Sequence, residues 1–290
     1  KTGRREAGRQ AYGIEAANDH DPVIEDIYRY AESCGIDIDT VAHEGGAAQI
    51  EMNFNHGDAI QLADQVFLFK RLVRKAAQNH NIFATFMAKP HQNQPGSAMH
   101  IHQSILHANL GHNIFVTGRN HDSAALKYYI AGLQRYIGAC MPLFAAGANS
   151  YRRITPYSDA PINTHWGRDN RTAGLRVPHS EPQARRIENR VPGADCNPYL
   201  AMAGTLACGL LGLTQRLRPS HEITGDAYRL AFSLPRSQHE ALSKLSHSKA
   251  LKQILGEDFT KLLIEVKAFE HDLFNRVISS WERENLLLNV

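Results

Sequence analysis

The segment "GSAMHIHQS" (residues 96–104) places two histidines two positions apart, shortly after Gly96. In a strand, alternate side chains point to the same face, so His100, His102 and Ser104 would share one face. The opposite face is apolar apart from one amide: Met99, Ile101, Gln103 and Ile105. This pattern predicts a half-buried strand whose polar face points into a working cavity. An edge strand with two solvated histidines is the alternative.

Two other segments carry carboxylates at strand spacing. In "QIEMNFN" (49–55), Glu51 falls on the polar face, and Glu44 lies in the "HEGGAAQ" loop just before it. In "ARRIENRVP" (184–192), Glu188 shares a face with Arg186 and Arg190. Carboxylates combined with an imidazole suit Mg²⁺ or Mn²⁺, whereas a structural zinc site would use thiolates. The alternative is that each glutamate forms a salt bridge with a nearby arginine.

Arginines are concentrated between residues 152 and 190, where eight occur with few acidic residues among them. Guanidinium groups bind carboxylate and phosphate groups bidentately, so this concentration predicts a bound anion. A divalent cation with converging arginines is what phosphoryl transfer requires. No G-x-x-x-x-G-K-[ST] motif occurs, which excludes a P-loop. Interleaved tyrosines and Trp166 would also suit a nucleic acid, but we expect no nucleic-acid partner.

The composition is that of a soluble globular protein. Of the 290 residues, 43% are hydrophobic and 21% are charged, enough for a substantial core. The net charge of +3 is too small to indicate a nucleic-acid partner. The four cysteines form no C-x-x-C motif, which indicates reduced thiols in a cytoplasmic protein. The most apolar run, residues 199–213, is shorter than a membrane span, so we expect a buried helix and no membrane partner.

Periodicity predicts the elements that would position these residues. The predicted elements are helices at 21–34, 59–80 and 121–141, and strands at 49–55, 82–88 and 99–105, the last two close enough to pair. Asp21 would cap the first helix, and Asn197-Pro198 would open the buried helix. Residues 142–196 should be loops that join short strands, and 236–288 a helical tail. Because strands and helices do not alternate regularly, the pattern favours one α+β domain.

Five ordered blocks of the sequence resemble the glutamine synthetase family. The blocks are "HEGGAAQIE" (43–51), "GSAMHIHQS" (96–104), "NSYRRITPYSDAP" (149–161), "WGRDNRTAGLRVP" (166–178) and "ARRIENRVPGADCNPYLAMAGTLACGL" (184–210). They are similar, in order and spacing, to the active-site blocks of that family's catalytic domain, from about residue 10 to the helical tail. "GRQAYGIEAANDHDPV" (8–23) and "HEGGAAQIEMNFNHGD" (43–58) look nearest to the bacterial branch that includes γ-glutamylpolyamine synthetases. The resemblance implies a curved, largely antiparallel sheet flanked by helices, with a helical C-terminal tail.

The resemblance also implies two divalent cations, Mg²⁺ or Mn²⁺, with ATP as co-substrate. The implied metal ligands are Glu44 and Glu51 on the glutamate side, and His100 and Glu188 on the nucleotide side. The implied ATP contacts are His102, Ser104, Arg176 and Arg186. A cation held between the nucleotide phosphates and these ligands would offset the negative charge of the reacting groups.

The same resemblance places the amino-acid substrate and the catalytic groups. Gly96 and Arg153 would hold glutamate, and Arg190 would contact its γ-carboxylate. Arg171 would contact the phosphoryl group during transfer, and Asp159 would take a proton from the incoming ammonium. The implied enzyme is an ATP-dependent ligase that phosphorylates the γ-carboxylate of glutamate and then lets ammonia or a primary amine displace the phosphate. The alternatives are a γ-glutamylpolyamine synthetase specifically, and a non-catalytic structural or regulatory member of the family.

Three positions depart from the family pattern and leave the acceptor amine open. Asp159 stands where the family usually has glutamate, Pro95 where members that use ammonia often have asparagine, and Gln183 where some have lysine. A shorter acid at 159 would leave room for an amine bulkier than ammonia.

The front of the chain also departs from the family. The family's first catalytic strand carries a Glu-x-Glu pair that should precede residues 8–22, and no such pair occurs there. A small N-terminal β-grasp domain is also absent from this sequence. We therefore expect residues 1–290 to be a catalytic domain without its first metal-binding strand, with weak metal binding and little activity on its own. We expect a homo-oligomer for the full-length protein.

Overall fold

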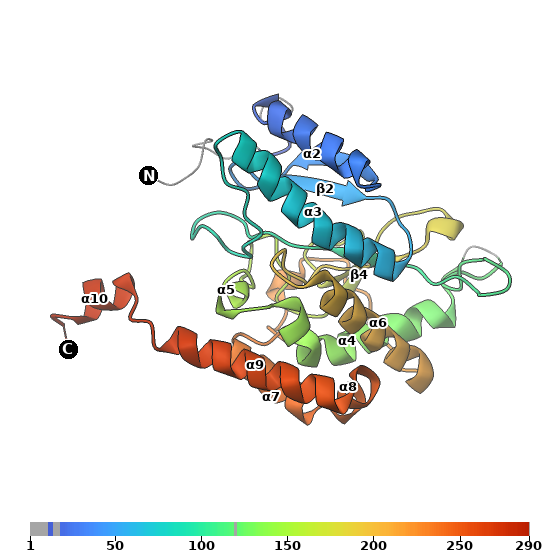
Figure 1. Ribbon diagram of the computed structural model, residues 1–290. Coiled ribbons are helices and arrows are strands. Elements are labelled where there is room, and N and C mark those ends of the chain that lie inside the picture. The colour runs from blue at the N-terminus through green and yellow to red at the C-terminus, as the bar shows by residue number, and fades with distance from the viewer. Residues whose placement is uncertain (1–10, 14–17, 119–120, 290) are drawn as a thin grey trace.

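The first layer of the fold consists of two helices packed on a β-hairpin (Figure 1). The computed structural model describes residues 11–13, 18–118 and 121–289. The elements of this layer are α2 (Asp21–Ser33), β1 (Ile38–His43), β2 (Ile50–Phe54) and α3 (Ala59–Asn79). Apolar side chains from both helices, among them Ile27, Phe69 and Ala76, form a small core against the hairpin. The predicted helices and the predicted strand at 49–55 are confirmed here.

The predicted cap of α2 is wrong by one position. His20 is the N-cap residue, no side chain caps the helix, and Asp21 lies in its first turn. An acidic residue in the first turn still interacts favourably with the positive end of the helix dipole. In α3, by contrast, the carboxylate of Asp58 accepts hydrogen bonds from the amides of Ile60 and Gln61.

The second layer contains four short strands, β3 (Ile101–Gln103), β4 (Trp166–Arg168), β5 (Leu175–Val177) and β6 (Ile187–Asn189). Their order in the sheet is β3-β6-β5-β4, and all neighbours are antiparallel except β4 and β5. Ile101 and Gln103 of β3 are buried, whereas His102 between them faces away from the core. The predicted period of two is therefore confirmed, and the chain has the expected mixture of α and β elements.

The strand predicted at residues 82–88 is wrong, and so is its pairing with residues 99–105. β3 pairs instead with β6, more than eighty residues further along the chain. Side chains of the 82–88 segment do alternate, since Phe83 is 94% exposed and Ala88 is buried. Among the described residues, however, no strand pairs with this segment, and β3 has β6 as its one partner at the edge of its sheet. Alternation shows which side chains are covered, but it does not say where a hydrogen-bonded partner strand will come from.

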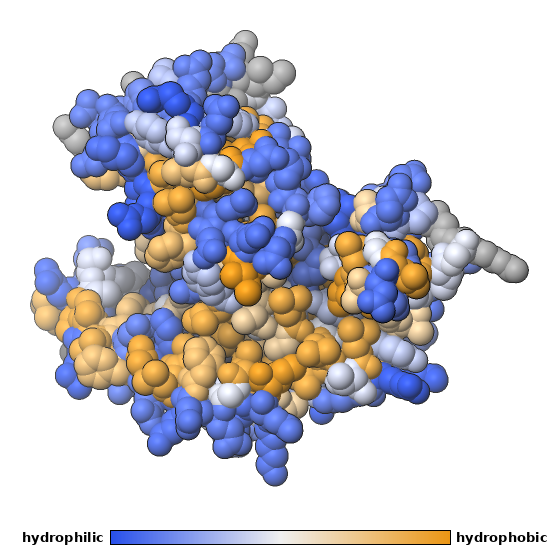
Figure 2. Space-filling model, turned by 45° about the vertical axis from the view of Figure 1, so that its right-hand side comes forward, coloured by the Kyte–Doolittle hydropathy of each residue, from blue (hydrophilic) through white to orange (hydrophobic). Residues whose placement is uncertain are grey.

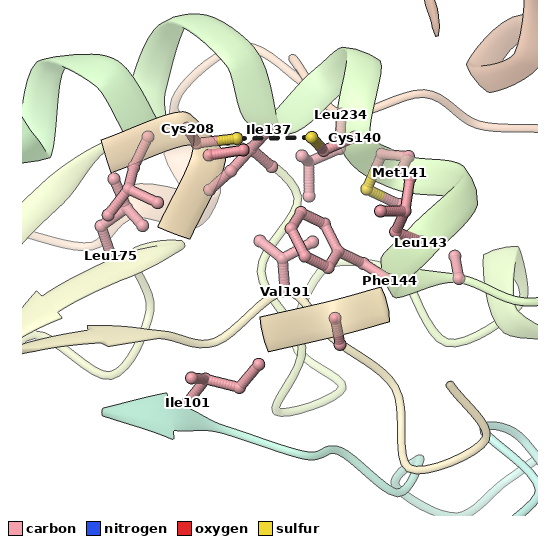
Figure 3. Packing of buried hydrophobic residues seen from close by; sticks show 14 of the residues in the cluster. Ile101, Ile137, Cys140, Met141, Leu143, Phe144, Leu175, Val191, Cys208 and Leu234 are labelled. Carbon is pink, nitrogen blue, oxygen red and sulfur yellow. Dashed lines mark hydrogen bonds between the residues drawn. The ribbon is translucent and has the colours of Figure 1, made fainter. Parts of the chain in front are cut away.

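The main core lies between the second sheet and a group of helices. These are α4 (Ala124–Phe144), α5 (Ala148–Tyr151), α6 (Pro198–Gln215), α7 (Gln238–His247), α8 (Lys249–Leu255), α9 (Glu257–Asn275) and α10 (Ser280–Leu286), with short 3₁₀ turns at Pro182–Ala184 and Ala227–Arg229. Asn197 caps α6 and Pro198 opens it, as predicted, whereas the helix expected at 121–141 spans 124–144. Figure 3 shows residues such as Ile137, Phe144 and Leu175 filling this core, with the Sγ atoms of Cys140 and Cys208 3.4 Å apart. Among the helices of the described residues, none is long and apolar enough to cross a membrane.

Apolar side chains also lie on the outside of the helical half. Figure 2 shows them as a band across the lower part of the molecule, the part that holds α6 and the C-terminal helices. The exposed apolar residues of α9 recur at helical spacing: Leu262, Val266, Phe269 and Leu273. In Figure 1, α10 extends beyond the body of the molecule. A face of this kind is typical of a contact with another protein surface.

Helices α4 and α6 pack so closely that only glycine fits at three positions of their contact, Gly132, Gly209 and Gly212. A Cβ atom at Gly132 would lie 2.2 Å from the carbonyl oxygen of Cys208, and one at Gly209 would lie 2.0 Å from the ring of Tyr129. Tyr129 is fully buried, and its hydroxyl donates a hydrogen bond to Oε1 of Gln103 in β3. The contact between α4 and α6 therefore supports β3 through the hydrogen bond from Tyr129 to Gln103.

We expect the substitution Gly209→Ala to destabilise the protein by about 3 kcal/mol, because overpacking forces buried groups apart. Urea unfolding followed by circular dichroism measures this as a lower midpoint at an unchanged slope. Gly225→Ala is the matched control, since nothing lies within 4 Å of its added Cβ, and it should change stability by less than about 0.5 kcal/mol. Equal midpoints for the two variants would show that the helix contact is looser than described.

Candidate functional site

The centre of the site is a row of three side chains across three strands. The register pairs His102 of β3 with Glu188 of β6, and Glu188 with Arg176 of β5. Opposed residues in neighbouring antiparallel strands have Cβ atoms about 5 Å apart, so their side chains meet on one face of the sheet. The polar face predicted for residues 99–105 thus continues across β6 and β5.

Glu188 is 2% exposed and is surrounded by positive or polar groups. Arg190 donates to its Oε1 at 2.6 Å, and Arg176 donates to its Oε2 at 2.9 Å. Burial alone would raise the pKa of Glu188, but Arg190, the two neighbouring histidines and Arg176 outweigh it and hold the pKa at about 2. Glu188 is therefore a permanently ionised carboxylate inside the protein, and its ionic state depends on these neighbours.

His100 lies beside the same carboxylate, with Nδ1 3.2 Å from Oε1 of Glu188. Burial, followed by the charge of Arg190, lowers the pKa of His100 to about 3, so the imidazole is neutral at physiological pH. Its Nε2 atom is buried without a hydrogen-bond partner in the described part of the chain. Neutral imidazole is the form that binds metals.

The predicted nucleotide contacts follow the same face outward. Arg186 donates through Nε to Nδ1 of His102 at 3.2 Å, and burial, together with Arg186 and other nearby arginines, lowers the pKa of His102. Ser104 comes just after β3 and is exposed. Arg176, at the other end of the row, also donates to Asp169 at 3.0 Å. The structure thus brings these predicted residues to one surface, but it does not by itself assign their roles.

An acidic pair, Glu44 and Glu51, lies at the end of the β-hairpin. Ala42 of β1 pairs with Glu51 of β2, and the amide of Glu44 donates to the carbonyl of Gln49, so the loop folds Glu44 back towards Glu51. Burial, followed by the negative charge of Glu51, raises the pKa of Glu44. Within the described residues, no Lys or Arg forms an ion pair with either carboxylate. The salt-bridge alternative therefore describes Glu188 but not this acidic pair.

Hydrogen bonds join the hairpin loop to the loop that contains Gly96. Nε2 of Gln49 donates to the carbonyl of Gly96 at 3.0 Å, and the amide of Ala47 donates to Oε1 of Gln94 at 3.1 Å. Gly96 in turn lies against Arg153, because a Cβ atom at position 96 would be 2.4 Å from Cγ of Arg153. Only glycine fits here without displacing the arginine.

Arg153 connects the Gly96 loop with the Glu188 cluster. It is buried and donates to the carbonyl of Val191. Burial lowers the pKa of Arg153 to about 10, which still leaves the guanidinium charged at neutral pH, and Arg190 contributes to the same shift. Arg153 and Arg190 therefore present two positive charges side by side, between Gly96 and Glu188.

The predicted catalytic residues Asp159 and Arg171 both lie near Tyr12, beside the acidic pair. Their charges both act on the phenol of Tyr12, whose pKa is raised by Glu44 first and also by burial and Asp159, while Arg171 opposes the shift. Asp159 and Tyr157 both have left-handed backbone conformations, with φ of 59° and 58°. Such conformations are strained for residues other than glycine and are often found at functional sites.

Sequence reasoning missed Tyr12, Lys89 and Tyr228 as neighbours of the site. Burial, followed by the charge of Arg153, lowers the pKa of Lys89, and its Nζ donates to the carbonyl of Gln94 at 2.6 Å. Burial, followed by the charge of Asp159, raises the pKa of Tyr228. Only Lys89 gave a signal, because it directly follows the apolar run at 82–88 and precedes the Gly96 loop.

The donors present suit a hard divalent cation, but each group is incomplete. Ligands on adjacent corners of an Mg²⁺ octahedron lie about 3 Å apart, which matches the 3.2 Å between His100 Nδ1 and Glu188 Oε1. Glu44 and Glu51 supply a second, all-oxygen pair. Among the described residues, no group of three or more histidine, cysteine or acidic side chains is arranged to hold a metal. Substrate oxygens, water or other protein groups would have to complete both coordination shells.

Comparisons with known proteins find similar sequences over nearly the whole chain. The model of the glutamine synthetase catalytic domain matches residues 1–286. The chain is 36% identical to γ-glutamylputrescine synthetase PuuA of Escherichia coli K12 over 99% of this chain and 61% of that protein. It is 32% identical to glutamate–isopropylamine ligase of a Pseudomonas species, over 90% of this chain and 58% of that protein. The chain thus spans about three-fifths of the curated relatives it matches.

Solved structures give the same result. The chain matches GmaS without ligand at a TM-score of 0.86 and 29% identity, covering 97% of this chain and 66% of that one. A GmaS/ADP complex matches at a TM-score of 0.87 and 28% identity, covering 96% and 66%.

Proposed function

The chain belongs to the glutamine synthetase family, and from this premise we propose that it is the catalytic part of an ATP-dependent ligase. The reaction joins the γ-carboxylate of glutamate to ammonia or a primary amine through a γ-glutamyl phosphate. The observation that supports this most is the buried Glu188 cluster, in which groups from three strands and the following loop surround one ionised carboxylate. Such a preorganised set of charges suits phosphoryl transfer, where charge must be offset without reorganisation.

In this proposal, His100 and Glu188 would hold one divalent cation, and Glu44 with Glu51 a second. The cations, Mg²⁺ or Mn²⁺, supply charge neutralisation at the phosphate oxygens. His102, Ser104, Arg176 and Arg186 bind ATP along the polar face of the sheet. The adjacent guanidinium groups of Arg153 and Arg190 hold the carboxylates of glutamate, and the backbone of Gly96 approaches the amino acid closely.

Arg171 and Asp159 act on the reacting groups. Arg171 offsets the charge of the phosphoryl group during transfer, and Asp159 accepts a proton from the incoming ammonium so that the neutral amine can attack. Because phosphate is a good leaving group, the acyl phosphate reacts readily with an amine, and it would react with water as well. The site must therefore exclude water while the amine enters.

A primary amine is the second candidate acceptor, alongside ammonia. The most specific form of this hypothesis is that the protein is a γ-glutamylpolyamine synthetase. Asp159 is one methylene shorter than the acid the family usually has, which leaves space for a substituent on nitrogen. The curated relatives include a γ-glutamylputrescine synthetase and a glutamate–isopropylamine ligase, which favours the same reading. A non-catalytic family member is the remaining alternative, and it gives no reason for the intact charge cluster around Glu188.

The test is phosphate release by the full-length protein with ATP and glutamate across a panel of amines. We expect release to depend on glutamate and on one class of acceptor, with ammonia, isopropylamine and putrescine compared at equal concentration of free base. Release that is equal with and without any amine would contradict the proposal. No release under any condition would support the non-catalytic alternative.

We also propose that residues 1–290 are a catalytic domain without its first metal-binding strand. The curved sheet of the family, a cytoplasmic location and assembly into a homo-oligomer belong to the same proposal. The exposed apolar face of α9 supports assembly.

Metal affinity provides a direct measurement. Because each proposed cation has two protein ligands among the described residues, we expect this polypeptide alone to bind Mn²⁺ at least about tenfold more weakly than the full-length protein. Electron paramagnetic resonance of free Mn²⁺ measures both affinities. As a control, Glu32→Gln on the distant helix α2 should leave the Mn²⁺ affinity of either protein unchanged. Equal affinities, or full ATP turnover by the 290 residues, would show that no essential ligand lies elsewhere.

A further inference from the structure

A cavity lies apart from the residues assigned above. It has a volume of about 480 Å³, within the range of sites that bind small organic molecules. Its walls come from α3, residues 84–87, the loop at 194–198 and Lys267 of α9. In Figure 1, α3 lies above this region and α9 lies below it. None of the proposed catalytic, metal-binding or substrate-binding residues lines the cavity.

Positive charge dominates the cavity. Lys70 and Arg74, one turn apart on α3, both line it, and Lys267 faces them from α9. Neither Lys70 nor Arg74 has an acidic partner within ion-pair distance among the described residues, whereas Lys267 pairs with Glu270 at 2.7 Å. Two neighbouring cations repel one another, and an anion between them relieves that repulsion.

Lys70 is held in a fixed position, so its charge is available at one place. Its Nζ donates to the carbonyls of Ala194 and Cys196, at 2.7 and 2.8 Å. An ammonium has three donors, so one N–H remains for another acceptor. Fixed cations bind an anion more favourably than mobile ones, because less side-chain entropy is lost on binding.

An aromatic wall accompanies the cations. The ring of Phe86 lies under both positive groups, 5.1 Å from the guanidinium of Arg74 and 5.6 Å from the ammonium of Lys70. Phe67 and Met87 add apolar surface at the same cavity. The beginning of α6, at Asn197 and Pro198, also lines it, and the positive end of a helix dipole favours negative charge. One acid, Asp195, also lines the wall: the hydroxyl of Ser150 donates to its Oδ2, and its charge partly opposes the lowering of the Lys70 pKa by burial.

We propose that this cavity binds a small organic anion, one that carries a phosphate or carboxylate group on an apolar or aromatic body. The anionic group contacts Arg74, Lys267 and the remaining donor of Lys70, and the body packs on Phe86 and Phe67. The proposal does not depend on the proposed ligase activity, since the two sites share no assigned residue. The loop at 194–196 lines the cavity and also contacts the Gly96 loop, because the amide of Ala194 donates to the carbonyl of Ser97.

Isothermal titration calorimetry with phenyl phosphate, at low ionic strength and in the presence of saturating ADP, tests the proposal. ADP occupies the nucleotide site, so phosphate binding there does not contribute. We expect saturable binding that weakens about tenfold in Arg74→Gln, because a charge-assisted hydrogen bond is lost. Arg71→Gln, an exposed arginine on the same helix outside the cavity, is the matched control and should bind as the unaltered chain does. Lys70 is left in place, because it holds two backbone carbonyls.

Two further arms identify the ligand chemistry. Phe86→Leu should weaken phenyl phosphate while leaving inorganic phosphate unchanged, and benzoate in place of phenyl phosphate shows whether a carboxylate suffices. Absence of saturable binding, or equal binding by Arg74→Gln and Arg71→Gln, would overturn the proposal. The same titration of the full-length protein should show the same site, and loss of binding there would show that another part of the protein fills the cavity.

Discussion

Replacement of Glu188 by glutamine is expected to destabilise this protein by about 4 kcal/mol at pH 7. The carboxylate is 2% exposed and accepts hydrogen bonds from Arg176 and Arg190. Removing its charge leaves two guanidinium groups close together without a counter-charge, and breaking a buried ion pair from one side typically costs 3–5 kcal/mol, roughly. Urea unfolding of the metal-free protein, with EDTA present, measures the loss.

The pH dependence of that loss has a definite sign. The pKa of Glu188 is about 2 in the folded protein, whereas an unfolded glutamate titrates near about 4.3. A lowered folded pKa means that the carboxylate stabilises the fold above the unfolded value, and that this contribution disappears as the pH falls through the folded value. The difference between the unaltered protein and Glu188→Gln should therefore be constant above about pH 5 and shrink towards zero near pH 2.

Glu265→Gln, on the exposed side of α9, is the control and should change stability little at any pH. A stability difference for Glu188→Gln that does not change with pH would contradict the assigned ionic state. In the full-length protein, the same substitution should lower the rate of the proposed ATP-dependent ligation at least a hundredfold, roughly, because the proposed metal ligand and the anchor of two arginines are lost together.

The second large effect is expected for Gly96→Ala. Its Cβ would lie 2.4 Å from Cγ of Arg153 and 2.5 Å from the carbonyl oxygen of Ala88. The side chain of Arg153 could rotate only by leaving its buried position, and the carbonyl of Ala88 is held by the amide of Ser97 at 2.9 Å. The methyl group therefore has to displace either the arginine or the loop that contains Gly96.

Kinetics of the full-length protein test this substitution. We expect kcat/KM for glutamate to fall about a hundredfold, the usual effect of misplacing a binding group by about 1 Å. The KM for ATP should change much less, since the atoms nearest the added Cβ belong to Arg153 and Ala88 and not to the proposed ATP contacts. Gly57→Ala is the control, because the nearest atom to its added Cβ is 3.8 Å away. Unchanged glutamate kinetics in Gly96→Ala would place the amino acid elsewhere.

Local patterns in the sequence predicted most of the elements and the faces of the strands. The alternation of residues 99–105 was sufficient to place His102 opposite the buried Ile101 and Gln103, because period two depends only on the backbone of one strand. The Asn197-Pro198 pair likewise predicted the start of α6, because capping is local.

Patterns could not predict how distant segments pair. The 82–88 segment alternates as a strand does, but its partner depends on which other segment reaches it, and β3 bonds to β6 instead. The arginines around Glu188 show the same limit. Sequence reasoning offered metal binding and salt bridges as alternatives, whereas the structure places Arg176, Arg190 and His100 around one carboxylate.

The site residues that the sequence missed are those whose role depends on packing. Tyr12 lies in the block at 8–23 but has no role assigned there, Tyr228 belongs to none of the quoted blocks, and only the folded chain brings their phenol groups near Asp159. Their positions follow from how loops cross one another, which no local pattern encodes.

Gln103, the amide that interrupts an otherwise apolar row, has a consequence for motion. Its side chain accepts a hydrogen bond from the hydroxyl of Tyr129, whose ring fills the space that Gly209 leaves open between α4 and α6. β3, which carries His102 and directly follows His100, is thereby attached to the close contact between α4 and α6. The surface that substrates would contact there is therefore expected to be rigid. Movements during a catalytic cycle would then occur in the loops opposite it.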